Sequence, residues 1–153
     1  MAHILIVEAR FYEQIADELA RGAVKALEEA GCTFERIAVP GAFEIPGAIA
    51  LAHAGGQHGG EHYDGYIALG CVIRGETSHY DYVCGESARG LQDLAIREGL
   101  AIGYGILTVE NKEQAMARAS VEMTSSKAGK GQHAVEACLT MVKLRERFGV
   151  SRS

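Results

Sequence analysis

The sequence lacks the features that are typical of membrane-spanning proteins and of nucleic-acid-binding proteins. It contains no tryptophan and only two prolines among 153 residues. No apolar run reaches the roughly 20 residues that a membrane-spanning helix needs, and the first residues become charged too soon for a secretory signal peptide. Acidic residues outnumber basic ones, 20 against 15, and no basic stripe or tail is present. We therefore expect neither a membrane nor a nucleic acid as a partner.

Cysteines are few and scattered, at Cys32, Cys71, Cys84 and Cys138. They form no Cys-x-x-Cys pair, so neither a zinc ribbon nor a thioredoxin-type redox site is indicated. Cys71 and Cys138 stand in apolar surroundings and are predicted to be small buried hydrophobic residues. This usage fits a reducing cytoplasm, where we expect the protein to be located.

Motifs that would indicate a bound cofactor or metal are incomplete. The glycines of residues 103–105 are followed by Thr108, where a dinucleotide-binding fingerprint needs its third glycine. His53, His58 and His62 surround a glycine-rich stretch that offers no rigid frame for a metal. We expect no cofactor and no metal ion.

What the sequence does contain is a regular alternation of strand-like and helix-like apolar patterns. The predicted strands cover residues 4–7, 33–39, 65–73 and 101–109. The predicted helices cover residues 12–30, 45–53, 80–98 and 110–119, with one more helix near the end and a flexible glycine-rich loop at residues 55–60. The alternation predicts an α/β fold, a flavodoxin-like three-layer α/β/α sandwich on a four-stranded parallel sheet. Without a linker or an internal repeat, residues 1–153 are expected to form a single domain.

The most informative segment ends the third predicted strand. Residues 68–73 are a buried-strand run, and the next eight residues collect glycine, hydroxyl groups, a histidine and carboxylates. Ligands of open α/β sheets bind at the carboxyl ends of strands, where this turn would lie. Backbone N–H groups after Gly75, together with Thr77 and Ser78, are predicted to hold an anion at a helix N-terminus. His79 would carry protons beside that anion.

Three other residues near strand ends have two interpretations each, and a helix arginine has one. Phe11 either stacks on a flat heterocycle or packs beneath the first helix, and the sequence alone slightly favours packing. Glu44 either accepts hydrogen bonds from a ligand or favours a helix N-terminus through the macrodipole. Arg74 either binds phosphate or braces its turn. Arg118, taken alone, is an ordinary solvated helix arginine.

Residues 9–12, 41–46, 69–82 and 103–111 together carry a resemblance that covers nearly the whole chain. In order and spacing they resemble the 6,7-dimethyl-8-ribityllumazine synthases of riboflavin biosynthesis, and residues 69–82 are the most specific part. The resemblance implies a cofactor-free enzyme that condenses 5-amino-6-(D-ribitylamino)uracil with 3,4-dihydroxy-2-butanone 4-phosphate. An imine forms, phosphate is eliminated and the ring closes to the lumazine. The alternative is a related protein that binds a flavin or lumazine without turnover.

The resemblance also implies roles for individual residues. Phe11 is expected to stack on the pyrimidine, and His79 to shuttle protons. The ribityl chain and the ring edge are expected to contact Ala42, Phe43, Glu44, Val72 and Ile73. The phosphate is expected to contact Gly75, Glu76, Thr77 and Arg118.

In this family the sites lie between subunits, so the resemblance implies that Tyr104 and Arg118 come from a neighbouring copy. The family assembles as pentamers, sometimes packed into shells of sixty subunits. The segment after Arg118 is longer here, with Glu122 where the family has a lysine, which leaves Lys127 as the candidate second phosphate-binding lysine. Because this segment alters the surface through which pentamers meet, and little chain precedes the first strand, we expect a pentamer or decamer rather than a sixty-subunit capsid.

Overall fold

The computed structural model describes residues 1–121 and 128–150, and the strands among them form one sheet. These strands are β1 (His3–Ala9), β2 (Thr33–Val39), β3 (Gly65–Ile73) and β4 (Ile102–Val109). All pair in parallel, in the order β2-β1-β3-β4. The predicted four-stranded parallel sheet is confirmed, and β2 and β3 have the predicted bounds.

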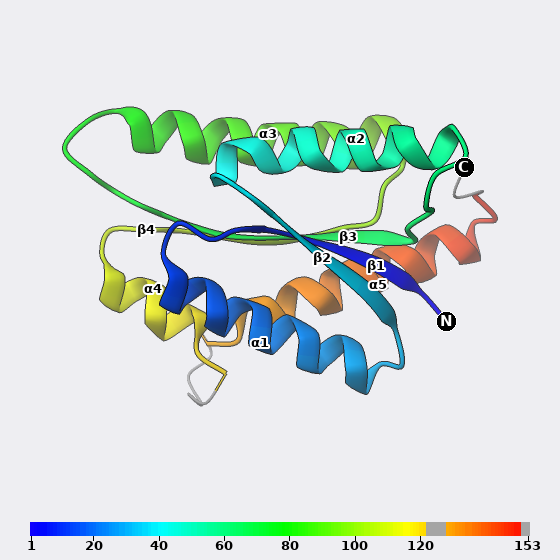
Figure 1. Cartoon of the computed structure of the whole chain (residues 1–153), viewed down its shortest axis with the longest axis horizontal. Coiled ribbons are helices and arrows are strands. Elements are labelled where there is room, and N and C mark those ends of the chain that lie inside the picture. The colour runs from blue at the N-terminus through cyan, green and yellow to red at the C-terminus, as the bar shows by residue number, and fades with distance from the viewer. Residues whose placement is uncertain (122–127, 151–153) are drawn as a thin grey trace.

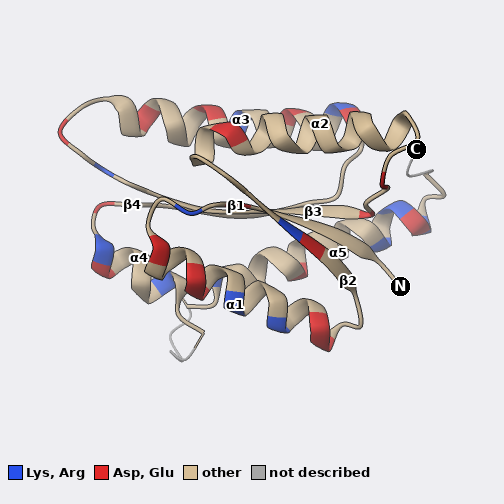
Figure 2. Cartoon of the chain, viewed as in Figure 1, with Lys and Arg blue, Asp and Glu red and all other residues tan. Residues whose placement is uncertain are grey.

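Helices cover both faces of the sheet (Figure 1). One face carries α1 (Glu13–Glu29), α4 (Lys112–Ala119) and α5 (Lys130–Arg147). The other carries α2 (Ile45–Gln57), preceded by the 3-10 turn η1 (Ala42–Glu44), and α3 (His79–Glu98). Charges of both signs are interspersed along these outer helices (Figure 2). The arrangement confirms the three-layer α/β/α sandwich.

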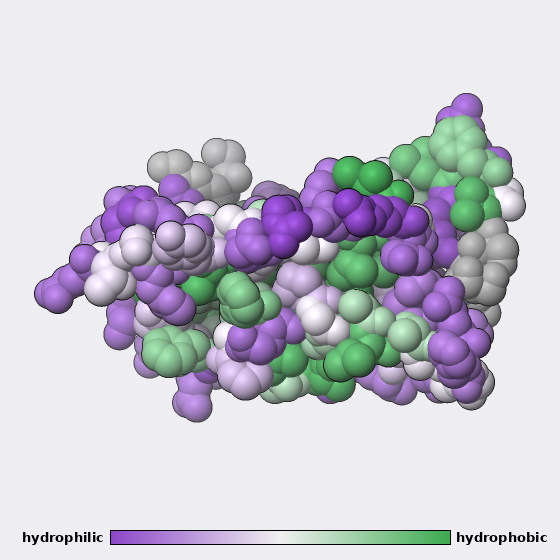
Figure 3. All heavy atoms as spheres, turned by 90° about the horizontal axis from the view of Figure 1, so that it is seen from above, coloured by the Kyte–Doolittle hydropathy of each residue, from purple (hydrophilic) through white to green (hydrophobic). Residues whose placement is uncertain are grey.

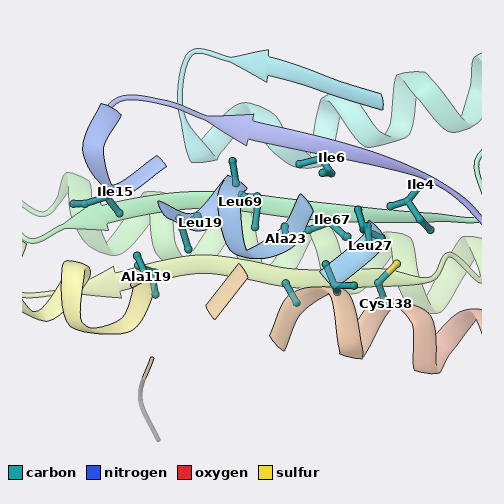
Figure 4. Close-up of a cluster of buried hydrophobic side chains, with 14 of the residues drawn as sticks. Ile4, Ile6, Ile15, Leu19, Ala23, Leu27, Ile67, Leu69, Ala119 and Cys138 are labelled. Atoms are coloured by element: carbon teal, nitrogen blue, oxygen red, sulfur yellow. The ribbon is translucent and has the colours of Figure 1, made fainter. Parts of the chain in front are cut away.

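The core consists of one apolar layer on each side of the sheet. On one side, strand residues such as Ile4 and Ile67 pack with Leu19 and Leu27 of α1 (Figure 4). Strands covered on both faces need apolar residues at successive positions, which explains the continuous apolar runs of β1 and β3. Each fully buried leucine or isoleucine stabilises the fold by about 1.5–3 kcal/mol relative to its exposure to water.

Two glycines allow α5 to approach the sheet and α1 unusually closely. A Cβ added to Gly103 in β4 would lie 2.0 Å from the carbonyl oxygen of Ala134 in α5. A Cβ added to Gly131 in α5 would lie 2.1 Å from the carbonyl oxygen of Leu19 in α1. These backbone contacts exclude any side chain at either position, and they place α5 tightly beside β4.

The main difference from the predicted elements concerns the glycine-rich segment after residue 53. The helix α2 continues to Gln57, so the first part of the expected flexible loop is helical. Gly56 is buried, and a Cβ there would lie 3.0 Å from the carbonyl oxygen of Glu61. Tertiary packing thus offsets the low helix propensity of glycine. Among the described residues, no helix combines the length and apolar character needed to cross a membrane.

Candidate active site

The candidate active site lies where β3 extends past β1. The last paired residues of the two strands are Glu8 and Leu69, after which β3 continues to Ile73, still paired with Val109 of β4. Backbone N–H and C=O groups on the β1 side of this extension are therefore open to a ligand. At this point the strand order reverses its direction. The connection after β1 leads to β2 on one side, and the connection after β3 leads to β4 on the other side. Such a switch point is where open α/β sheets bind ligands.

A cavity of about 590 Å³ occupies this end of the sheet. It is formed by the turns after β1 and β2, the end of β3 and the start of α3. The expected site residues that line it are Phe11, Ala42, Phe43, Glu44, Val72, Ile73, Gly75, Thr77 and His79. Segments far apart in the sequence thus bring most of the predicted residues to one place.

The remaining predicted residues lie elsewhere. Glu76 belongs to the same exposed turn but does not line the cavity. Tyr104 and Arg118 border a different cavity, described below. Lys127, with Glu122, lies outside the described residues.

Phe11 stands in the turn between β1 and α1. Its side chain is 75% exposed, and its ring meets the ring of Tyr12 edge to face, with centroids 5.0 Å apart. The packing of Phe11 beneath α1, which the sequence alone slightly favoured, is therefore wrong. An exposed ring on a cavity wall is available to stack on a flat ligand.

A buried carboxylate anchors the turn that carries Phe11. Glu8 is 3% exposed and accepts hydrogen bonds from Arg10 Nη1 at 2.7 Å and from Arg36 Nε at 2.6 Å. Arg10 also pairs with Asp17 of α1. A buried charge is costly unless it is paired, so these arginines make Glu8 tolerable and fix the backbone just before Phe11. Our sequence analysis did not identify Glu8, although a carboxylate inside an apolar strand is unusual.

The turn after β2 approaches the cavity through Gly41 and η1. A Cβ on Gly41 would lie 3.3 Å from Glu44 Oε1, so the glycine leaves room for that carboxylate. Ala42 is buried beneath the turn, whereas Phe43 is mostly exposed. Glu44 lines the cavity and is also the N-cap residue of α2. Its location therefore agrees with both interpretations, a hydrogen-bond acceptor for a ligand and an acid at a helix N-terminus.

The turn after β3 leads directly into α3. His79 is the first residue of that helix, and its backbone N–H donates to Thr77 Oγ1 at 3.3 Å. Gly75, Thr77 and His79 are all exposed on the cavity wall. The helix N-terminus, with its positive dipole end, faces the same space, an arrangement suited to an anion.

Arg74 braces this turn. Its Nε lies 2.8 and 3.1 Å from the two carboxylate oxygens of Glu110, and its Nη1 lies 3.5 Å from Asp81. Its guanidinium also lies over the ring of Tyr80, 4.3 Å from the centroid. These contacts tie the end of β3 to α3 and to the end of β4, so the bracing interpretation of Arg74 is the one that the structure favours.

A second cavity of about 350 Å³ lies along β4, an edge strand of the sheet. It is bordered by Tyr104 of β4, Arg118 of α4, and Lys130 and His133 of α5. Arg118 Nη1 donates to the carbonyl of Gln114 at 3.0 Å, and the Lys130 ammonium lies 5.7 Å from the Tyr104 ring centroid. Three basic residues therefore share this cavity. Sequence reasoning missed Lys130 and His133, because only the packing of α5 beside β4 brings them near Arg118.

The thiol in the first cavity is not poised for nucleophilic attack. Cys71 lines the cavity and is half-buried rather than fully buried as predicted, and burial raises its pKa to about 11. A thiol with that pKa stays protonated at neutral pH, whereas the nucleophile is the thiolate. Cys138 is fully buried, as predicted, and all four cysteines are free.

Comparison with known proteins assigns the family. The sequence matches the family described as 6,7-dimethyl-8-ribityllumazine synthase over residues 1–146. The 6,7-dimethyl-8-ribityllumazine synthase 1 of Rhizobium meliloti is 55% identical over 150 residues, which cover 98% of this chain and 95% of that protein. The synthase of Agrobacterium fabrum is 56% identical, with 96% and 97% covered, and that of Sphingopyxis alaskensis is 51% identical, with 98% and 99% covered. The chain therefore belongs to the 6,7-dimethyl-8-ribityllumazine synthase family.

Proposed function

We propose that the cavity at the end of β3 is the site where this enzyme makes 6,7-dimethyl-8-ribityllumazine in riboflavin biosynthesis. The reaction condenses 5-amino-6-(D-ribitylamino)uracil with 3,4-dihydroxy-2-butanone 4-phosphate and releases phosphate and water. The observation that carries the assignment is the convergence of an exposed aromatic ring, open strand backbone and a helix N-terminus on one cavity. The aromatic ring suits stacking on a heterocycle, the strand backbone suits hydrogen bonds with the edge of that heterocycle, and the helix N-terminus suits a phosphate.

The aminouracil would occupy the part of the cavity nearest β1. Phe11 stacks on the pyrimidine, and the backbone of Val72 and Ile73 pairs with the ring edge, because β1 no longer occupies that side of β3. The ribityl chain runs along η1, where Ala42, Phe43 and Glu44 contact it. Carboxylate and backbone acceptors suit the hydroxyl groups of that chain.

The phosphate of the butanone would lie at the N-terminus of α3. Gly75, Glu76 and Thr77 belong to the turn whose N–H groups and hydroxyl are suited to an anion. No lysine or arginine is among the described residues that line this cavity, so the described part of the same chain offers a phosphate there no lysine or arginine side chain. The basic cavity along β4 supplies what is missing if a second copy presents Arg118, together with Tyr104 and Lys130, to the first. Lys127 stays a candidate for the same role.

His79 is the proposed proton carrier. Imine formation removes water, and elimination of phosphate requires a proton to leave carbon, so both steps need proton transfer near neutral pH. His79 lies on the cavity wall beside the turn that would hold the phosphate. Most of the rate gain is expected to come from holding two reactants together in a productive orientation.

The assembly that completes these sites is proposed to be a pentamer or a pair of pentamers. Contact between the first cavity of one copy and the β4 cavity of the next joins different surfaces, and such head-to-tail contacts form a ring when the rotation between successive copies closes. Exposed apolar side chains also occur on the layer of α2 and α3, where Leu51 and Ile96 are 77% and 72% exposed (Figure 3). Light scattering is expected to give a mass of five or ten chains of 16.3 kDa, and a shell-sized particle would contradict this. We also propose the cytoplasm as its location, which suits its free cysteines.

The reaction is tested by following lumazine absorbance and phosphate release together, with both substrates and a blank without protein. The substrates react slowly unaided, so the blank sets the baseline. A protein-dependent rise of both products in equal amounts is expected. If both traces equal the blank while the protein binds a lumazine or flavin, the chain is a binding protein without turnover.

A further inference from the structure

A second group of polar side chains lies at the other end of the sheet, where β1 and β2 begin. His3 is the first residue of β1, Glu35 belongs to β2, and Glu61 belongs to the loop between α2 and β3. Figure 1 shows this loop returning to the end of the sheet at which the N-terminus lies. One ligand atom from each residue can be chosen so that all lie within 4.8 Å of one another.

The three side chains face one another closely. Nε2 of His3 lies 3.1 Å from Oε1 of Glu61 and 3.9 Å from Oε1 of Glu35. Around a metal with bonds of about 2.0–2.2 Å, neighbouring ligand atoms are roughly 3–3.5 Å apart. Nε2 is shielded from solvent and makes no hydrogen bond with any residue of ranges 1–121 and 128–150. The distance from Nε2 to Glu61 thus falls in this range, whereas Glu35 lies beyond it and would move closer to share a metal ion.

Surrounding contacts orient the histidine and one carboxylate. Nδ1 of His3 lies 2.7 Å from Oγ1 of Thr33, so a proton on Nδ1 leaves the lone pair on Nε2. The Tyr63 ring stacks on His3, with centroids 5.2 Å apart and planes 18° apart. The Tyr63 hydroxyl donates to Glu35 Oε2, while Oε1 of the same carboxylate is the oxygen nearer His3.

We propose that His3, Glu35 and Glu61 bind a divalent cation of the zinc type, with water completing its coordination. Imidazole nitrogen and carboxylate oxygen are both Zn²⁺ ligands, and the two carboxylates balance the charge of the ion. The hydrogen bond to Thr33 and the phenol bond to Glu35 match the outer contacts that orient metal ligands. The cation would join the loop before β3 to β1 and β2. Its role is structural, because the site lies at the amino ends of the strands, away from the condensation.

The proposal is tested by titrating Zn²⁺ into the full chain after treatment with a chelator, using calorimetry. We expect one saturable site per chain that Glu61→Gln and His3→Ala each weaken at least tenfold. Zn²⁺ should also raise the midpoint of thermal unfolding of the wild type but not of these variants. The matched control is His58→Ala, because His58 is an exposed histidine whose hydrogen bond is to the carbonyl of Ala54. This variant should bind Zn²⁺ like the wild type.

Co²⁺ distinguishes this site from the cysteines. Bound to His3 and the two glutamates, Co²⁺ should give visible absorption bands without the intense near-ultraviolet band of cobalt–thiolate bonds. Absence of binding at millimolar Zn²⁺, or binding that is unchanged in Glu61→Gln and His3→Ala, would overturn the proposal. Glu61→Gln should keep wild-type lumazine formation, so failure of this proposal is separable from failure of the proposed enzymatic site.

Discussion

Glu8 and Leu69 face each other as the last paired residues of β1 and β3, and the candidate active-site cavity opens just beyond them. Glu8 is also the buried carboxylate that binds Arg10 and Arg36. The residue that ends the pairing of the two strands therefore also anchors the turn that carries Phe11. We therefore expect folding and substrate binding to be linked through this one carboxylate.

Glu8→Gln should lower both stability and affinity for the aminouracil. The amide keeps the shape of the side chain but loses the charge that binds two arginines. We expect the free energy of unfolding in urea to fall by about 1.5–3 kcal/mol, and KM for the aminouracil to rise because the Phe11 turn loosens. The control is Glu86→Gln, which breaks an exposed pair with Arg89 on α3 and should leave the unfolding midpoint unchanged. Equal midpoints for the two variants would refute the anchoring role.

Phe11→Ala should weaken binding of the aminouracil selectively. Loss of a stacking contact of about 1.4 kcal/mol corresponds to a tenfold rise in KM, with KM for the butanone phosphate little changed. Steady-state kinetics with each substrate varied in turn measures this split. Phe148→Ala removes a similarly exposed phenylalanine after the end of α5 and is the matched control. An unchanged KM in Phe11→Ala would exclude stacking.

His79→Ala should slow turnover by about tenfold without abolishing it. This is less than the roughly hundredfold effect common for general acid–base groups, because the two substrates remain juxtaposed and the substrate phosphate can also carry protons. Measuring kcat and both KM values of the variant shows whether turnover falls while substrate binding is kept. Complete loss of turnover with normal substrate binding would show that His79 is indispensable to the chemistry.

Cys71→Ala should keep its activity at neutral pH but change how the stability of the protein depends on alkaline pH. The pKa of the Cys71 thiol is raised from 9.0 to about 11, so the folded state holds its proton more tightly than the unfolded state. Stability therefore falls as pH rises from about 9 to about 11, where the unfolded chain loses protons first. The unfolding midpoint of Cys71→Ala should fall less over this range. Identical profiles for variant and wild type would contradict the effect of burial.

Gly103→Ala should be among the most damaging single-methyl additions to this chain. The new Cβ would meet the carbonyl oxygen of Ala134 at 2.0 Å, and backbone cannot rotate away as a side chain can. We expect a loss of about 3 kcal/mol, the upper end for overpacking. Gly85 is an exposed residue of α3, and a Cβ added there would have no atom within 4 Å. Gly85→Ala should instead raise the free energy of unfolding by roughly 0.5–1 kcal/mol. Denaturant unfolding of both variants compares the two effects directly.

The sheet and most helices could be predicted because burial on both sides of a parallel sheet leaves its own pattern in the sequence. The apolar run of β3 and the stripe of α1, including Leu19 and Leu27, are examples. The helical end of α2 could not be predicted, since it depends on Gly56 lying against the carbonyl of Glu61, a contact between segments. Local propensity at a glycine-rich stretch carries no information about such packing.

The place of His79 and Thr77 on the cavity wall was predictable, because they follow the end of β3. The exposure of Phe11 was not predictable from the residues alone, because an aromatic residue after a strand packs or is exposed according to the turn that Glu8 fixes. Lys130 was missed because its approach to Arg118 requires α4 and α5 to flank the same strand. Such proximity is a property of the assembled layers, so spacing along the chain does not reveal it.

Each active site is proposed to combine the first cavity of one copy with the β4 cavity of another. This proposal is tested by pairing Phe11→Ala/His79→Ala, impaired in the first cavity, with Arg118→Ala/Lys130→Ala, impaired in the second. Assayed with both substrates below saturation, where losses in KM and in turnover multiply, each variant alone should keep only a small fraction of wild-type activity. Rings co-assembled from equal amounts place intact halves together at about one quarter of the sites. We predict that lumazine formation in these mixed rings rises to about a quarter of the wild-type rate. A rate no higher than the average of the two parent variants, in assemblies that mass spectrometry shows to be mixed, would contradict the shared site.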